Sequence, residues 1–208
     1  MNLEHLGDSL DYWKGEVFRQ LRINGWLQDF AVEPMISDEQ PWNSQNIRVY
    51  RHLLSLEDSE PVFHKNAVFS HQPREAYFTE ITHRGDLFLD PDNGITTGEA
   101  SVKHVCVEDI HSYFRGDFVM DPSLLVFQHA GHDVFANRIK EIVKKVISPE
   151  NNLDRNLYCC SYECGKVAML FFSVNRRRML TIPKIFSNYI GSGGRSNIKI
   201  WSRQLLNI

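Results

Sequence analysis

Apolar residues recur at helical spacing near the start of the chain and gather into short runs farther on. Over residues 4–22 they return every three to five positions, which predicts a helix with one apolar face. Short apolar runs bounded by turn-forming residues are typical of buried strands. By these criteria the predicted strands are residues 30–32, 86–89, 124–127, 157–161, 167–174 and 198–201. The further predicted helices are residues 47–56, 74–82, 107–114, 134–147 and 183–190.

The alternation of helices and strands between residues 74 and 174 predicts the fold class. Strands that alternate with helices form a mainly parallel sheet with helices on both faces. We expect residues 87–89 and 124–127 to be adjacent, parallel, central strands of that sheet. The pair 157–161 and 167–174 is too closely spaced for a crossover helix, so it is expected to form an antiparallel hairpin. With no repeat or linker in the sequence, we predict one α/β domain over residues 1–208.

The composition supports a single folded domain. A chain of 208 residues that is 42% hydrophobic and 12% aromatic can bury one substantial core. The net charge of −3 provides no overall positive field that would recruit nucleic acid. No apolar run reaches the length of a membrane span, and the first residues lack the pattern of a signal peptide. We therefore expect a cytoplasmic protein with no membrane contact, whose four cysteines are free thiols.

The polar segment Asp90-Pro91-Asp92-Asn93-Gly94 follows a predicted buried strand and is the sharpest candidate site. Ligands of open α/β sheets bind outside the carboxyl ends of the strands. Pro91 and Gly94 would shape a turn that presents two carboxylates and one amide. Such groups can hold an exocyclic amine, bind a metal through oxygen, or position a water molecule. The alternative interpretation is an ordinary turn, because these residue types are the usual turn formers.

Gln128 and His129 end the next predicted strand. If the two strands are neighbours, His129 lies at the same edge of the sheet as Asp90. A histidine beside a carboxylate can serve as a base or as a ligand. The alternative is a strand-end histidine whose hydrogen bonds are satisfied within the fold.

Acidic and basic residues at two other places extend the list of candidates. Asp8, Asp11 and Lys14 share one face at the start of the first helix, where acidic residues also interact favourably with the helix dipole. A basic cluster near the glycine-rich residues 191–194 could meet the phosphates of a nucleic acid, or could be a solvated loop. The cluster comprises Arg176, Arg177, Arg178 and Arg195.

Three segments together resemble a family of uncharacterised bacterial proteins of similar length. Residues 7–14 match its opening Gly-Asp-x-x-Asp-aromatic-x-Lys helix. Residues 87–94 match its apolar strand ending in Asp-Pro-Asp-Asn-Gly, and residues 124–129 match a later strand ending in Gln-His. The resemblance spans most of the first 130 residues and implies no established activity.

The layout is also similar, more distantly, to Rossmann-like methyltransferases. In those enzymes a strand ends in an Asp-Pro-Pro-Tyr-type motif, and a helix, a strand, a helix and a terminal hairpin follow, as residues 86–174 do here. The resemblance implies a Rossmann-like three-layer fold with a mostly parallel sheet and a C-terminal antiparallel hairpin. It departs from the family at residues 30–34, where the glycine-rich loop that would hold S-adenosylmethionine is missing.

Three functions remain open on the sequence. The first is a methyltransferase-like enzyme with S-adenosylmethionine as cofactor, acting on an amine-bearing acceptor such as a nucleic acid. The second is a nuclease or hydrolase that binds a divalent metal through Asp8, Asp11, Asp90 and Asp92. The third is a non-catalytic binding module on a methyltransferase-like fold. For the first, the catalytic candidates are Asp90, Asp92, Asn93 and His129, and the substrate-binding candidates are Asp8, Asp11, Lys14, Pro91, Gly94 and Gln128.

Overall fold

The computed structural model describes residues 2–65, 67–71, 73–115, 121–129, 135–148, 155–187 and 196–201. Within them, the helices are α1 (Ser9–Ile23), α2 (Ser44–Leu53), α3 (Arg74–Thr79), α4 (Val107–Phe114), α5 (Phe135–Val146) and α6 (Arg176–Ser187), with 3-10 turns at Leu3–His5 and Phe69–His71. The strands are β1 (Ala31–Glu33), β2 (Leu87–Leu89), β3 (Gly94–Thr96), β4 (His104–Cys106), β5 (Ser123–His129), β6 (Tyr158–Cys164), β7 (Val167–Ser173) and β8 (Ser196–Trp201).

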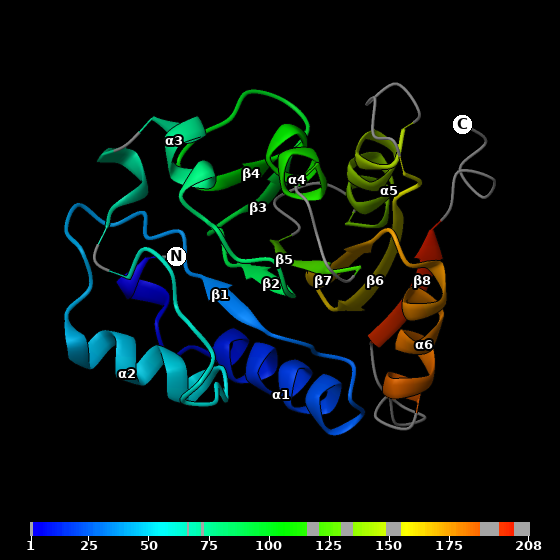
Figure 1. The fold of residues 1–208 in the computed structure, drawn as a ribbon, viewed down its shortest axis with the longest axis horizontal. Helices are drawn as coiled ribbons and strands as arrows, with labels where there is room; N and C mark the ends of the chain where they lie inside the picture. The colour runs from blue at the N-terminus through cyan, green and yellow to red at the C-terminus, as the bar shows by residue number, and fades with distance from the viewer. Residues whose placement is uncertain are drawn as a thin grey trace.

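Six of these strands form one mixed sheet in the order β1-β2-β5-β7-β6-β8, as Figure 1 shows. The strands β1, β2 and β5 are parallel neighbours. The strand β7 pairs antiparallel with both β5 and β6, and β6 pairs antiparallel with β8. The predicted α/β class is confirmed, as is the parallel pairing of Leu87–Leu89 with its neighbour from residue 124 onward. The prediction of a mainly parallel sheet is wrong: among the described strands of this sheet two pairings are parallel and three are antiparallel, because β6, β7 and β8 all pair antiparallel with their neighbours.

Helices cover both faces of this sheet, and each face has its own apolar core. The helices α1, α2 and α6 pack on one face, against side chains such as Phe88 and Leu125. The helices α3, α4 and α5 pack on the other, against Leu87 and Leu124 (Figure 1). Residues that follow one another in a strand thus contribute to opposite cores, because successive side chains of a strand point to opposite faces.

The start of the chain is divided into two elements rather than one helix over residues 4–22. Gly7 adopts a φ of +91°, and Asp8 then caps α1 by accepting hydrogen bonds from the backbone N–H groups of Leu10 and Asp11. Within α1, Gly15 allows a close approach to α2, because a Cβ there would lie 2.0 Å from the carbonyl oxygen of Leu53. The glycine therefore brings the two helices together.

The predicted start of the last helix, which was expected over residues 183–190, is wrong. The helix α6 begins at Arg176, where the Asn175 side chain accepts a hydrogen bond from the backbone N–H of Arg178. Pro183 lies inside this helix and does not begin it. The helix persists because its apolar face, which includes Met179 and Phe186, is buried in the core.

The sequence pattern also missed a second, smaller sheet. The strands β3 and β4 each have three residues and pair in parallel, with Ile95 opposite Val105. Three residues are too few to establish an alternating pattern, so no periodicity indicated them. Their position is important, since β3 continues directly from the acidic turn after β2.

No helix in the described part of the chain combines the length and the apolar character that crossing a membrane requires.

Candidate functional site

The acidic turn after β2 is held in shape by Gln128 at the end of β5. The Gln128 amide oxygen accepts a hydrogen bond from the Ile95 backbone N–H at 2.6 Å. Its NH2 group donates to the carbonyl oxygens of Asn93, at 3.2 Å, and of His129, at 2.7 Å. Gly94 packs directly on this amide, because a Cβ there would lie 2.5 Å from it, and adopts a φ of +88°. Gln128 and Gly94 therefore shape the site.

Asp90 is fully buried and contacts side chains of the fold. Lys14 Nζ lies 2.8 Å from its Oδ1 and 3.1 Å from its Oδ2. The Tyr50 hydroxyl donates to Oδ2 at 2.9 Å. Burial raises the pKa of Tyr50 well above its usual value, with the Asp90 carboxylate adding to the effect. These contacts make Asp90 a group that fixes the turn to α1 and α2.

Asp11 completes a buried carboxylate–lysine–carboxylate cluster with Lys14 and Asp90. Its Oδ1 accepts a hydrogen bond from Lys14 Nζ at 3.0 Å, and its Oδ2 accepts one from the Gly7 backbone N–H at 2.9 Å. Burial raises the pKa of Asp11 in spite of Lys14. Burial alone would lower the pKa of Lys14, but the two carboxylates outweigh it and raise the pKa. The sequence identified all three residues but did not predict that they are buried.

A second buried polar cluster at the end of β1 was not predicted. The Glu33 carboxylate is fully buried; it accepts hydrogen bonds from the Met35 backbone N–H at 2.8 Å and from the Tyr77 hydroxyl. His64 Nδ1 lies 2.6 Å from Glu33, and His64 Nε2 lies 3.2 Å from Glu80. Glu33 directly follows the predicted strand 30–32, as Asp90 follows the predicted strand 86–89. That position could have marked Glu33 as a candidate site residue. Nothing in the sequence links it to His64.

The backbone and electrostatics of this second cluster are unusual. His64 and Met35 adopt φ values of +39° and +47°, which cost energy for residues with a side chain. Burial alone would lower the pKa of His64, but the hydrogen bonds and charges of Glu33 and Glu80 outweigh it and raise the pKa. The carbonyl oxygen of Glu33 also accepts a hydrogen bond from the Asp90 backbone N–H at 3.0 Å, so the two clusters meet.

Fewer of the predicted site residues are exposed to solvent than expected. Asn93 and His129 are exposed, and their carbonyl oxygens share the NH2 group of Gln128, so the two residues are neighbours. Asp92 is partly buried and accepts a hydrogen bond from the Ser37 hydroxyl. We refer to Asp92, Asn93 and His129 as the edge group. Residues 130–134, which follow His129, lie outside the described residues.

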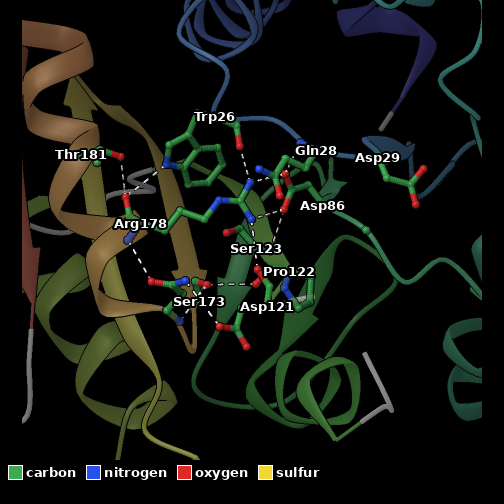
Figure 2. A network of polar contacts seen from close by, with 12 residues as sticks. Trp26, Gln28, Asp29, Asp86, Asp121, Pro122, Ser123, Ser173, Arg178 and Thr181 are labelled. Carbon is green, nitrogen blue, oxygen red and sulfur yellow. Dashed lines mark hydrogen bonds and ion pairs between the residues drawn. The ribbon is translucent and has the colours of Figure 1, made fainter. Parts of the chain in front are cut away.

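The basic cluster lies at the opposite, amino-terminal edge of the parallel strands. Arg178 forms a buried ion pair with Asp86, just before β2, with its Nη1 2.8 Å from Oδ1 (Figure 2). Its guanidinium also lies over the Trp26 ring, 4.3 Å from the centroid. Burial raises the pKa of Asp86 against the effect of Arg178. Arg176 and Arg177 are exposed.

Arg178 therefore serves the fold, because it connects α6 to the loops before β1 and β2. Arg195, the fourth residue of the predicted cluster, lies outside the described residues. The described arginines and the edge group lie at opposite ends of the same strands, so they do not form one site.

The aspartates do not assemble into a metal site. Among the described residues, no group of three or more His, Cys, Asp or Glu side chains could hold a metal ion. The reason is visible in the contacts: Asp8 caps α1, while Asp11 and Asp90 bind the ammonium group of Lys14. The nuclease or hydrolase hypothesis gains no support from these residues.

The loop after β1, where the resemblance implies S-adenosylmethionine, does not fit that cofactor. Residues 33–36 are all buried by other parts of the chain, with the Ile36 carbonyl oxygen bonded to the Phe69 backbone N–H. The Glu33 carboxylate already has three partners. The loop also has no glycine to allow close backbone approach. We therefore derive no reaction step through this cofactor.

All four cysteines are free thiols, and none belongs to the edge group. Cys106, Cys159 and Cys160 are buried, whereas Cys164 is partly exposed. Burial raises the pKa of Cys106 to about 11 and raises the pKa of Cys159 and Cys160 as well. Buried thiols of this kind are poor nucleophiles.

Comparison of the chain with protein-family models, with curated proteins and with solved structures gives no match.

Proposed function

We propose that this chain is a binding module on a methyltransferase-like fold, and that it holds an amine-bearing group, such as a nucleobase, at the edge group. The observation that carries this proposal is the fixed turn after β2. Gln128 holds the backbone beside Asn93 and His129, so their side chains extend from a rigid support. A carboxylate, an amide oxygen and an imidazole are suitable acceptors for an exocyclic amine.

The strand order supports a methyltransferase-like fold. The parallel strands β1, β2 and β5 are followed by β7, which runs in the opposite direction between β5 and β6. The turn between β6 and β7 contains Gly165 with a φ of +62°. This arrangement agrees with the Rossmann-like layout and the terminal hairpin that the resemblance implies.

The buried loop after β1 favours a binding module over an enzyme that uses S-adenosylmethionine. In an α/β sheet the carboxyl edge is the usual ligand site, and two parts of that edge differ here. At β1, residues 33–36 are covered by the chain. At β2 and β5, Asn93 and His129 are exposed. At the carboxyl edge of the sheet, the acceptor position at β2 and β5 is therefore accessible, whereas the cofactor position at β1 is covered.

The proposed ligand is a single base and not a long phosphate backbone. The net charge is −3, and the exposed Arg176 and Arg177 lie at the other end of the strands from the edge group. Contact between these arginines and nucleic-acid phosphates remains a separate proposal. It predicts binding that weakens steeply with salt, whereas binding of one base at the edge group is much less salt-dependent.

The test is calorimetric titration with matched nucleosides. Adenosine and cytidine carry an exocyclic amine, whereas inosine and uridine have a carbonyl oxygen in its place. We expect the amine-bearing member of each pair to bind about three- to tenfold more tightly, the range of one or two hydrogen bonds. Asp92→Ala should remove most of this preference, because alanine has no side-chain acceptor. Asp58→Ala, at an exposed loop position, is the matched control.

Two results would contradict the proposal. Equal affinity for the members of each pair, or no binding to any of them, would exclude an amine-specific edge site. Titration with S-adenosylmethionine tests the enzyme alternative in parallel. Saturable micromolar binding of that cofactor would show that the loop at residues 33–36 opens in solution and would restore the methyltransferase hypothesis.

A further inference from the structure

A cavity of about 550 Å³ lies on the other face of the sheet, between α3 and α4. Leu87 and Leu89 of β2 and Leu124 of β5 lie beneath it on one face of the sheet, and all three are almost fully buried (Figure 1 shows both helices above these strands). Phe78 of α3 and Tyr113 of α4 contribute partly exposed aromatic side chains to its walls. The space is partly open to solvent, and its volume is within the range of small-molecule sites.

Polar contacts at both ends of the cavity connect its walls. At one end Arg74 of α3 forms a bidentate ion pair with Asp109 of α4 and donates to the His104 carbonyl oxygen at 2.7 Å. At the other end the Tyr113 hydroxyl donates to the carbonyl oxygen of Gly85. Each contact fixes a distance between α4 and another segment. The walls of the pocket are therefore held in place.

The rim of the cavity is slightly acidic. Five charged side chains line it, namely Arg74, Glu75, Arg84, Glu108 and Asp109. The ion pair between Arg74 and Asp109 neutralises two of them. The other three are the exposed carboxylates of Glu75 and Glu108 and the guanidinium of Arg84, so one negative charge is in excess. Aromatic walls with an acidic rim are complementary to a ligand with an apolar body and a positive charge.

We propose that this cavity binds a small molecule with a flat apolar ring system and one protonated amine. The ring would lie between Phe78 and Tyr113, where removal of its surface from water provides most of the binding energy. The amine would lie at the rim near Glu75 and Glu108. The site is separate from the edge group, so it does not depend on the function proposed above.

A matched series of indole compounds tests the ligand class. Tryptamine carries a protonated amine, tryptophol is neutral, and indole-3-acetate is an anion, so the three differ mainly in charge. We expect tryptamine to bind about threefold or more tightly than indole-3-acetate by calorimetry, with tryptophol between them. The combined variant Glu75→Gln/Glu108→Gln should abolish this order, and the exposed Glu39→Gln is the control.

The location is tested with a variant that fills the pocket. Ser112→Trp, at an exposed position on the α4 wall, should abolish tryptamine binding and leave the folded state intact. If it does not fold, Thr79→Trp blocks the cavity from α3. Methyl NMR of the unmodified protein is independent of both and should show tryptamine-dependent shifts of Leu87, Leu89 and Leu124. No binding, tighter binding of the anion, or shifts confined to other leucines would overturn the proposal.

Discussion

Replacement of Lys14 by methionine probes the buried cluster that joins α1 to the turn after β2. The Lys14 side chain is only 3% exposed. Its ammonium lies 3.0 Å from Asp11 and 2.8 Å from Asp90, and 4.4 Å from the centroid of the Phe127 ring. Methionine keeps the apolar stem but removes the charge. Two buried carboxylates then face each other without a cation.

The expected decrease in the free energy of unfolding is large, because removal of the Lys14 ammonium group leaves buried carboxylates without a cation. Breaking a buried ion pair by removal of one partner typically costs about 3–5 kcal/mol. The free energy of unfolding of a whole domain is about 5–15 kcal/mol, so this is roughly a fifth or more of a typical value. For a domain of this length each kcal/mol corresponds to about 2–4 °C in Tm, which predicts a decrease of roughly 6–20 °C for Lys14→Met.

Urea denaturation and thermal melting followed by circular dichroism measure the change. Lys166→Met is the matched control, since Lys166 is exposed in the turn between β6 and β7. The control should change the free energy of unfolding by no more than about 0.5 kcal/mol. In an Asp90→Asn background, Lys14→Met should cost at least about 1 kcal/mol less, because only Asp11 then remains unpaired.

Two outcomes would refute this reasoning. If Lys14→Met costs less than about 1 kcal/mol, the cluster is better hydrated than its burial indicates. If the cost is the same with and without Asp90→Asn, the lysine does not stabilise the turn through Asp90. The turn would then be fixed chiefly by Gln128.

Three further predictions concern other parts of the chain. Gly94→Ala should lower the free energy of unfolding by about 1–3 kcal/mol in urea, because a Cβ would meet Gln128 and because φ is positive; an unchanged midpoint would contradict the described turn. The pKa of His64 is raised in the folded state, so its stabilising effect is complete below the unfolded value near 6.5 and is lost as pH rises through the higher folded pKa. The difference in Tm between the unmodified protein and His64→Gln should therefore shrink on going from pH 6 to pH 9, with the exposed His71→Gln as control. Ellman's reagent should label Cys164 before the buried thiols in native protein and count four thiols after denaturation; two would indicate a disulfide.

The local pattern of the sequence predicted two of the helices closely. The helix Val107–Phe114 was predicted at both ends, and Phe135–Val146 within one residue. The start of α6 was missed because three arginines suggested a loop, whereas the buried face around Met179 extends the helix across them. The short strands β3 and β4 could not be seen, because Gly94–Thr96 and His104–Cys106 form no apolar run of the kind that indicated the equally short β2.

The sequence pointed to the residues of the candidate site but not to the contacts that each of them makes in the fold. Asp90, Gly94 and Gln128 were identified from their positions at strand ends. Their roles depend on contacts with residues far along the chain, such as Tyr50, forty positions from Asp90. Sequence position alone could not distinguish the buried Asp90 from the exposed Asn93 three residues later.

The sequence by itself determined the order of the helices and of the six strands of the main sheet, the apolar faces that pack on that sheet, and the polar turn at the end of β2. These features depend on periodicity and turn chemistry, which act between residues close in the chain. Only the tertiary structure decided which charges are buried. Lys14 meets Asp90, 76 positions away, and Arg178 meets Asp86, 92 positions away, because the sheet brings strand ends and helices together. In this protein, therefore, the fold itself uses many of the charged residues that the sequence offered as a site.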